Sequence, residues 1–505
     1  MIAADQPQRV PLSRLLTGVP GLDEVLGGGV PEYSFTLIAG SPGTGKTTLS
    51  QQIMFALATA ERPALHFTVL GEPPLKMLRY QQQFRFFDHA KVGSSVRYVN
   101  LSTEALTGDA DTLLDRIVRE VEADSPGIVV VDSFRTAVRA AGAEGGMELQ
   151  GFLQRLALHL TTWQATSFLV GEYVERELED NPAFTVADGI LWLYQSVERN
   201  SIVRKMQVMK MRGQASLPGL HTMRIAADGL QVFPRILKRS TATSLRPDQR
   251  LSTGVPGLDE LLGNGVPAWD SILVAGPAGS GKSTLGSHFV AAGLANNEPA
   301  VIAVFEERPK EYLEHTRTLR PELADAVRRG LLEVIYLRPL DLSVDEALLE
   351  IQAAVARLNA QRLLIDSLSG FELALAPTFR EDFRESLYRM VGALTGAGVT
   401  VLMTTEVGMS FTDLDFSTNL ISFLTDDIIL LRYVEIEGEL QKVMAVIKMR
   451  GSTHSKQLRT YDVTHDGVVI GHPLTDYIGV ITGVARQRVD QSPALPLLQP
   501  GDEAT

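Results

Sequence analysis

The sequence of 505 residues predicts an α/β protein built from two tandem domains, each a mostly parallel, twisted sheet with helices on both faces. Three observations predict this fold class. The chain contains an internal repeat, short apolar runs alternate with longer helix-compatible stretches, and each half carries a glycine-rich loop between a strand and a helix.

The repeat divides the chain. Residues 17–31 read TGVPGLDEVLGGGVP and residues 253–267 read TGVPGLDELLGNGVP, and Lys46 and Lys282 follow at the same offset of 236 positions. The spacing predicts two homologous domains, 1–240 and 241–480. Their junction is expected in the polar stretch 236–250, and residues 481–505, which contain three prolines and little pattern, are expected to form a flexible tail.

The elements of each half follow the same order. In the first half, buried strands are predicted at 34–40, 64–70, 127–132, 166–173 and 189–194, with helices at 48–60 and 147–163 between them. The second half repeats the strands at 271–276, 300–307, 362–367, 399–406 and 426–434. Continuously apolar strands separated by helices are typical of a parallel sheet that is covered on both faces.

Composition excludes several function classes. The chain has no cysteine, which rules out disulfides, thiolate metal sites and cysteine nucleophiles. It has neither a signal-peptide pattern at its N-terminus nor an apolar run of the ~20 residues that span a bilayer, so we expect a cytoplasmic protein with no membrane partner. The net charge is −13, and residues 241–505 hold 23 Lys and Arg against 35 Asp and Glu, which speaks against a general nucleic-acid-coating protein.

Both glycine-rich loops fit the phosphate-loop (P-loop) pattern, which predicts nucleotide binding. In this pattern backbone N–H groups surround the phosphates, the lysine brings a positive charge to them, and the next helix directs its N-terminus at the same anion. The residues concerned are Gly40, Ser41, Pro42, Gly43, Thr44, Gly45, Lys46, Thr47 and Thr48, and Gly276, Pro277, Ala278, Gly279, Ser280, Gly281, Lys282, Ser283 and Thr284.

A Mg²⁺ ion that accompanies ATP requires oxygen ligands. The hydroxyls of Thr47 and Ser283 are the candidates in the loops. Asp132 and Asp366 end apolar strands at an offset of 234 and are the matching carboxylates, although an aspartate at a strand end is often only a turn former.

Hydrolysis or phosphoryl transfer also needs a group that orients or deprotonates the attacking oxygen. Glu306 and Glu307 end a strand in the second half, whereas Gly71 and Glu72 occupy the matching place in the first. This difference predicts unequal chemistry in the two domains, unless these glutamates are ordinary solvated strand ends.

A Lys-Met-Arg-Gly motif recurs late in each half. It contains Lys210 and Arg212 in the first half and Lys448 and Arg450 in the second. On a strand the two cations of each pair point to the same face. Each pair is therefore a candidate phosphate clamp, in its own subunit or in a neighbour's, against the alternative of solvated strand charges.

Taken together, these motifs resemble the KaiC family of ATPases and autokinases within the RecA-like P-loop superfamily. The resemblance rests on the TGVPGLDE lead-in, the two P-loops, FEERP, LLIDSLSG, DDIILLRYVEIEGE and IKMRGSTHSK, which together span nearly the whole chain. It implies two RecA-like domains, a homohexameric double ring, and ATP with Mg²⁺ at subunit interfaces, where the Lys and Arg pairs of one subunit touch the nucleotide of the next.

The resemblance also implies roles for the glutamates. Glu306 matches the family's general base for autophosphorylation, with Glu307 beside it. Glu72 matches one of two glutamates tied to slow ATP hydrolysis in the first ring, and Gly71 replaces the other. The first-ring hydrolysis rate is therefore open, whereas nucleotide binding is still expected.

The phosphoacceptor segment departs from the family pattern of adjacent Ser and Thr. Ser422 matches the serine, but Phe423 stands in place of the threonine. A two-site cycle is therefore not expected, and Ser422 is the single matched acceptor unless it is a plain loop serine. The C-terminal stretch also differs, so a KaiA-type stimulating partner is not supported, whereas a KaiB-like or other signalling partner remains a candidate.

Three functions compete on this basis. The first is an ATP-driven regulatory enzyme, both ATPase and serine/threonine autokinase, whose phosphorylation state is read by a protein partner. The second is a DNA-dependent motor on the same fold, which the acidic charge balance disfavours. The third is a nucleotide-gated scaffold with little turnover, for which Gly71 is the main support.

Overall fold

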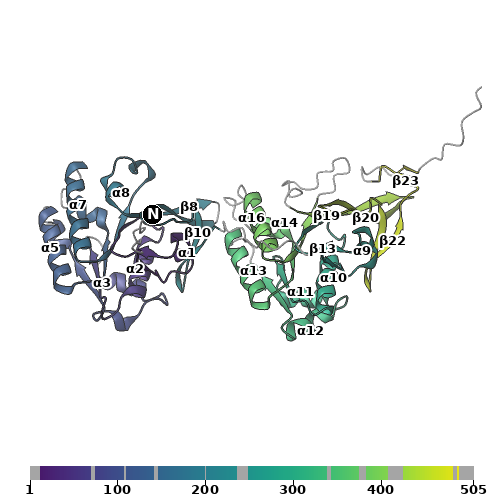
Figure 1. The fold of residues 1–505 in the computed structure, drawn as a ribbon, viewed down its shortest axis with the longest axis horizontal. Helices are drawn as coiled ribbons and strands as arrows, with labels where there is room; N and C mark the ends of the chain where they lie inside the picture. Colours follow the sequence, from purple (N-terminus) through teal and green to yellow (C-terminus); the bar gives the residue numbers. More distant parts are fainter. Residues whose placement is uncertain are drawn as a thin grey trace, which may run out of the picture. The chain divides into compact units, whose positions relative to one another are not determined.

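The computed structural model describes residues 12–69, 74–106, 110–140, 146–198, 201–235, 248–337, 343–374, 383–407, 425–480 and 486–487. The chain forms two compact units. Among the described residues, unit 1 comprises those up to 235 and unit 2 those from 248 onward. Figure 1 shows the two units.

Unit 1 alternates strands and helices up to β8 and then continues as antiparallel strands. Its elements are β1 (Arg14–Leu15), α1 (Leu22–Leu26), β2 (Val30–Pro31), β3 (Phe35–Gly40), α2 (Lys46–Leu57), β4 (Ala64–Thr68), α3 (Pro74–Gln81), η1 (His89–Lys91), β5 (Val96–Asn100), α4 (Ser102–Leu106), α5 (Ala110–Asp124), β6 (Ile128–Asp132), α6 (Phe134–Ala140), α7 (Gly146–Thr162), β7 (Thr166–Glu172), η2 (Glu175–Glu177), α8 (Pro182–Val186), β8 (Gly189–Glu198), β9 (Ser201–Met211), β10 (His221–Ala226) and β11 (Gly229–Phe233).

The main sheet of unit 1 has nine strands in the order β11-β10-β9-β8-β3-β7-β6-β4-β5. The strands from β8 to β5 pair in parallel, and β8 to β11 pair antiparallel. Both faces of β3 are buried: Leu37 packs with α5 and α7 in one core cluster, and Ile38 packs with α1 and α2 in the other. Figure 1 shows α5 and α7 on the side of the sheet away from α2.

Unit 2 repeats this order of elements. They are β12 (Arg250–Leu251), α9 (Pro256–Leu261), β13 (Val266–Pro267), β14 (Ser271–Gly276), α10 (Lys282–Ala295), β15 (Ala300–Val304), α11 (Pro309–Thr316), α12 (Glu322–Arg328), β16 (Leu332–Tyr336), α13 (Val344–Leu358), β17 (Arg362–Asp366), α14 (Leu368–Ala374), α16 (Phe383–Gly396), β18 (Thr400–Glu406), β19 (Asp427–Ile436), β20 (Glu439–Met449), β21 (Arg459–Thr464), β22 (Gly467–Pro473), β23 (Tyr477–Ile478) and β24 (Arg486–Gln487).

The nine-stranded sheet of unit 2 has the order β16-β15-β17-β18-β14-β19-β20-β21-β22, the same arrangement as in unit 1. Its P-loop strand β14 is again central, between β18 and β19. Ile272 and Val274 pack with α9 and α10 on one face of the sheet. Helices α13, α14 and α16 pack against other strands of the same sheet.

These two sheets confirm the predicted fold class. Each strand predicted from an apolar run is present, with its ends shifted by a few residues. The antiparallel strands β9 to β11 and β20 to β22 extend each sheet beyond the predicted parallel part. Of the stretch expected to be a tail, Arg486–Gln487 forms β24 and pairs with β23, and its other residues lie outside the described ones.

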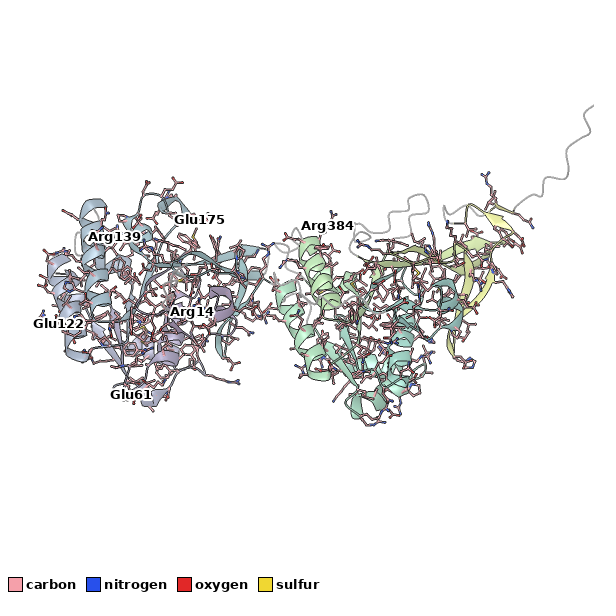
Figure 2. All side chains as sticks on the ribbon, in the orientation of Figure 1. Arg14, Glu61, Glu122, Arg139, Glu175 and Arg384 are labelled. Carbon is pink, nitrogen blue, oxygen red and sulfur yellow. The ribbon has the colours of Figure 1, made fainter. Side chains whose placement is uncertain are left out.

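The surface of each unit carries many charged side chains. Glu61 and Glu122, for example, are exposed at the surface of unit 1 (Figure 2). Among the residues that the structure describes, no helix combines the length and the apolar character needed to cross a membrane.

Candidate functional site

The two glycine-rich loops connect the central strand of each sheet to a helix. In unit 1 the loop runs from Gly40, the end of β3, to Lys46, the start of α2. The residue before the helix is Gly45 in unit 1 and Gly281 in unit 2, with φ of 100° and 94°. Glycine adopts this left-handed conformation without the steric penalty of a side chain. The helix N-terminus that follows presents free N–H groups, the usual backbone site for an anion.

The loop lysines occupy the same position in both units. The Nζ of Lys46 donates a hydrogen bond to the backbone carbonyl of Ser41 at 2.8 Å, and Lys282 donates to that of Pro277 at 2.8 Å. Burial lowers the pKa of Lys46, and the charges of Glu172 and Asp132 oppose this effect. Each lysine is therefore held over its own loop, close to carboxylates that favour its charged form.

The strand-end aspartates lie beside the loops but have different hydroxyl partners. Thr47 donates a hydrogen bond from Oγ1 to Oδ2 of Asp132 at 2.7 Å in unit 1. In unit 2, Asp366 accepts a hydrogen bond of 2.5 Å from Thr404 on β18. The structure thus brings Thr47 and Asp132 together, whereas Asp366 is engaged by a threonine that the sequence analysis did not single out.

This set of oxygen donors fits a Mg²⁺ ion bound together with a nucleotide. A hydroxyl and a carboxylate supply hard oxygen ligands, but Mg²⁺ takes six ligands and usually shares them with phosphate and water. Within the described residues, no group of three or more His, Asp or Glu side chains is arranged to hold a metal. A Mg²⁺ ion at Thr47 and Asp132 would therefore depend on the phosphates for further ligands.

A cleft of about 320 Å³ opens at the loop of unit 1. It includes Glu172, the last residue of β7, which the sequence analysis did not identify as a site residue. The matching residue in unit 2 is Glu406, at the same offset of 234 that relates Asp132 to Asp366, and this offset is the signal that would have found it. The lining residues are Gly43, Gly45, Lys46, Thr47, Thr48, Asp132, Ser133, Val170, Gly171, Glu172 and Ile225.

Glu306 and Glu307 follow strand β15, and their side chains have different partners. Oε1 of Glu306 accepts a hydrogen bond from the Ser367 hydroxyl at 3.2 Å, next to Asp366. Glu307 pairs with His315 on α11 at 2.6 Å. Burial lowers the pKa of Lys282, and the charges of Glu406, Asp366 and Glu306 oppose this effect. Glu306 is therefore the member of the pair that faces the loop lysine.

Several candidate residues lie outside the described residues. These are Gly71 and Glu72 of the first half, and Ser422 and Phe423 of the second.

The Lys and Arg pairs lie at the opposite end of the sheet from the P-loop of their own unit. Met211 pairs with Gly189, and Gly189 pairs with Thr36 near the start of β3, whereas the loop follows Gly40 at its end. Met211 is thus four strand residues from Gly40, which at about 3.3 Å per residue is roughly 13 Å. The same register holds in unit 2. A clamp on the nucleotide of the same domain is thus disfavoured.

Comparisons with known proteins agree with this geometry. The family described as "ATPase: KaiC" matches the chain twice, over residues 15–236 and 251–475. Circadian clock oscillator protein KaiC 1 of Synechocystis sp. is 28% identical over 94% of this chain and 92% of its own length. The KaiC proteins of Prochlorococcus marinus and Nostoc sp. are each 27% identical, over 96% and 94% of this chain and 97% and 92% of their own lengths.

Proposed function

The chain belongs to the KaiC family of ATPases, and from this premise we propose that it is an ATP-driven regulatory enzyme working as a homohexameric double ring. In this proposal the first domain hydrolyses ATP with the help of Glu72. The second domain transfers phosphate from ATP to Ser422 of the chain, and a KaiB-like or other signalling protein reads the phosphorylation state.

The main support for this proposal is that the chain contains two similar nucleotide sites. In both units the loop lysine donates a hydrogen bond to the carbonyl of the second residue of its own P-loop, Ser41 or Pro277, and lies near a strand-end aspartate. A lysine, a helix N-terminus and a carboxylate at the end of the neighbouring strand form the set that Mg-ATP requires. Two such sites in one chain support nucleotide-dependent work in both domains.

The proposed phosphotransfer uses Glu306 as the general base. Its carboxylate takes the proton of the serine hydroxyl while the serine oxygen bonds to the terminal phosphorus of ATP and the bond from that phosphorus to ADP breaks. The Ser367 hydroxyl, which donates to Oε1 of Glu306, orients this carboxylate. Mg²⁺, when bound, would neutralise part of the phosphate charge.

The position of the basic pairs supports a multi-subunit site. Because Lys210 and Arg212 lie toward the end of the sheet away from the loop of their own unit, a nucleotide bound by another copy of the chain fits their position better. A ring in which one copy binds ATP and the next contributes Arg212 satisfies this geometry. Lys448 and Arg450 would act in the same way in the second ring.

Mass spectrometry of the protein after incubation with Mg-ATP tests this function. We expect one added phosphate on the peptide that contains Ser422, together with accumulation of ADP. If ADP accumulates but no peptide carries phosphate, the protein would be a ring ATPase without autokinase activity. Nucleotide binding without either product would favour the scaffold hypothesis, and stimulation of hydrolysis by DNA would favour the motor.

A further inference from the structure

Three residues of unit 1 form a closed set of hydrogen bonds at the end of the sheet away from the P-loop. The backbone N–H of Phe35 donates to Oδ2 of Asp188 at 3.1 Å, and the N–H of Asp188 donates to the carbonyl of Phe35 at 2.8 Å. Arg212 donates from its backbone N–H to the carbonyl of Asp188 and from NH1 to Oδ1, both at 2.9 Å. One aspartate thus joins the first residue of β3 to the arginine.

Unit 2 contains the same hydrogen bonds between the strand, the aspartate and the arginine backbone, and a longer contact between the arginine and aspartate side chains. The N–H of Ser271 donates to Oδ2 of Asp426 at 3.2 Å, the N–H of Asp426 donates back to Ser271 at 3.0 Å, and the N–H of Arg450 donates to the carbonyl of Asp426 at 3.1 Å. NH1 of Arg450 lies 3.7 Å from Oδ1 of Asp426. The equivalent residues therefore lie against one another in both units, with a hydrogen bond between the two side chains in unit 1 and a longer ion pair in unit 2.

The arginines are exposed, whereas their aspartates are not. The side chain of Arg212 is 61% exposed and that of Asp188 is 31% exposed. In unit 2 the contrast is greater, because Arg450 is 76% exposed and Asp426 is 10% exposed. A long, solvent-exposed arginine samples many rotamers, and fixing it has an entropic cost. A largely buried carboxylate that is itself fixed by a strand N–H restricts this freedom before any ligand arrives.

We propose that Asp188 and Asp426 are positioning residues that orient Arg212 and Arg450 toward the nucleotide bound by a neighbouring copy of the chain. This inference rests on the proposed function, in which these arginines act across a subunit boundary. Each aspartate holds its arginine with one carboxylate oxygen and its own P-loop strand with the other. The strand that leads into the nucleotide loop of the same subunit thereby fixes the orientation of the arginine through the aspartate.

The test uses substitutions that remove the charge but keep the strand contact. In Asp188→Asn, the amide oxygen can still accept from Phe35, but the amide N–H₂ group no longer attracts Arg212. We expect lower turnover at saturating Mg-ATP with a nearly unchanged KM, because orientation matters most in the transition state. The loss is expected within about twofold of that in Arg212→Ala, and the double variant is expected to lose no more than Arg212→Ala alone.

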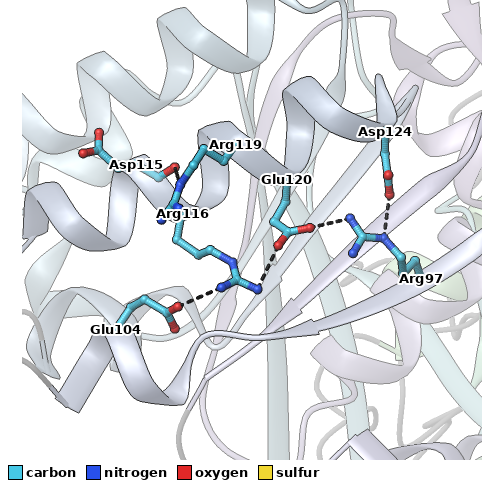
Figure 3. A network of polar contacts seen from close by, with 7 residues as sticks. All are labelled: Arg97, Glu104, Asp115, Arg116, Arg119, Glu120 and Asp124. Atoms are coloured by element: carbon cyan, nitrogen blue, oxygen red, sulfur yellow. Dashed lines mark hydrogen bonds and ion pairs between the residues drawn. The ribbon is translucent and has the colours of Figure 1, made fainter.

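The matched control comes from another ion pair of unit 1. Asp124 on α5 accepts a 2.6 Å hydrogen bond from Arg97, and its side chain is 32% exposed, close to the value for Asp188 (Figure 3). Asp124→Asn therefore makes the same chemical change at an aspartate of nearly equal exposure, away from the basic motif. We expect it to leave turnover unchanged.

The outcomes distinguish a failure of the proposed role of the arginines from a failure of the positioning role of the aspartates. If Arg212→Ala and Arg450→Ala both retain full turnover, the role of these arginines in the proposed function is wrong. If an arginine variant loses turnover but its aspartate variant does not, only the positioning role is wrong. Additive losses in the double variant would also overturn the positioning role, because the aspartate would then act independently of the arginine. Loss of nucleotide-dependent assembly of Asp188→Asn in light scattering would overturn it for the same reason. The pair Asp426→Asn and Arg450→Ala repeats the test in unit 2.

Discussion

The ammonium group of Lys46 lies 2.8 Å from the backbone carbonyl oxygen of Ser41, so the lysine of the loop is bonded to a neutral acceptor within the loop itself. A phosphate oxygen is a stronger partner for the lysine than a carbonyl, because its negative charge attracts the ammonium in addition to accepting the hydrogen bond. The arrangement keeps the lysine ordered while leaving it available to an anion.

Replacing Lys46 by alanine is therefore expected to weaken ATP binding by unit 1 about 10- to 100-fold. Assembly that depends on this nucleotide should weaken with it. Titration with a fluorescent ATP analogue and light scattering measure the two effects. Lys76→Ala, which removes an exposed lysine on α3, serves as the control, and an unchanged affinity in Lys46→Ala would remove the loop from the nucleotide site.

Glu306→Gln is expected to abolish phosphotransfer while leaving nucleotide affinity nearly intact. The amide retains a hydrogen-bond acceptor for Ser367 but has no basic oxygen to take a proton. Incorporation of labelled phosphate measures the effect. Glu314→Gln on the neighbouring helix α11 changes an exposed carboxylate in the same way and should retain activity. Normal labelling of the Glu306 variant would assign the base to another residue.

Ser422→Ala is expected to eliminate the main phosphorylated peptide. Phe423 has no hydroxyl, so the matched pair of acceptors found in the family pattern is reduced to one. Peptide mapping after incubation with Mg-ATP makes the comparison with the unmodified chain. Label that persists on Ser417 or Thr418 would move the acceptor to one of those residues.

Sequence reasoning predicted the parts of the fold that burial dictates. The strands β3 and β14 are apolar on both faces, as a central parallel strand must be, and the offset of 236 relates their loops. The antiparallel strand β10 was missed because it is only half buried, and its sequence HTMRIA has no continuous apolar run.

Site residues that belong to a motif could be predicted from the sequence, whereas those whose position depends on strand pairing could not. The spacing of Lys210 and Arg212 indicates that they share a face of a strand, but it does not tell which end of the sheet they occupy. Only the pairing of Met211 with Gly189 places them away from the loop. Similarly, Glu172 has no motif of its own, and its place in the cleft follows from the parallel pairing of β7 with β3.

Asp427→Asn is expected to stabilise unit 2 at neutral and alkaline pH. Burial, together with the charges of Asp270 and Asp426, raises the pKa of Asp427 to about 7. The folded chain therefore binds a proton more tightly than the unfolded chain, and its stability falls as the pH rises from about 4 to about 7. Asparagine does not ionise, so the substitution removes this loss of stability at high pH. Thermal unfolding should show a higher midpoint at pH 8 and a smaller gain at pH 5, whereas the exposed Asp462→Asn should change neither. An equal or lower midpoint at pH 8 would contradict the assignment.

His66→Ile is expected to stabilise unit 1, and by more at pH 5 than at pH 8. His66 is fully buried in β4, and neither of its ring nitrogens has a hydrogen-bond partner in another described residue. Its equivalent in β15 is Ile302, which packs in the core of unit 2, so the fold accepts isoleucine at this position. Removing an unsatisfied buried polar group is worth about 1–3 kcal/mol.

The pH dependence of this substitution follows from the same burial, which lowers the pKa of His66 to about 3. Below the ordinary histidine pKa of about 6.5, the unfolded chain takes up a proton that the folded chain excludes, so the histidine destabilises the fold progressively as the pH falls. Isoleucine cannot titrate and abolishes this loss. Thermal unfolding of both chains at the two pH values measures it, with the exposed His465→Gln as the control. If the gain were the same at pH 5 and pH 8, His66 would have to be protonated in the folded chain, and its ring could not be buried without a partner as the structure places it.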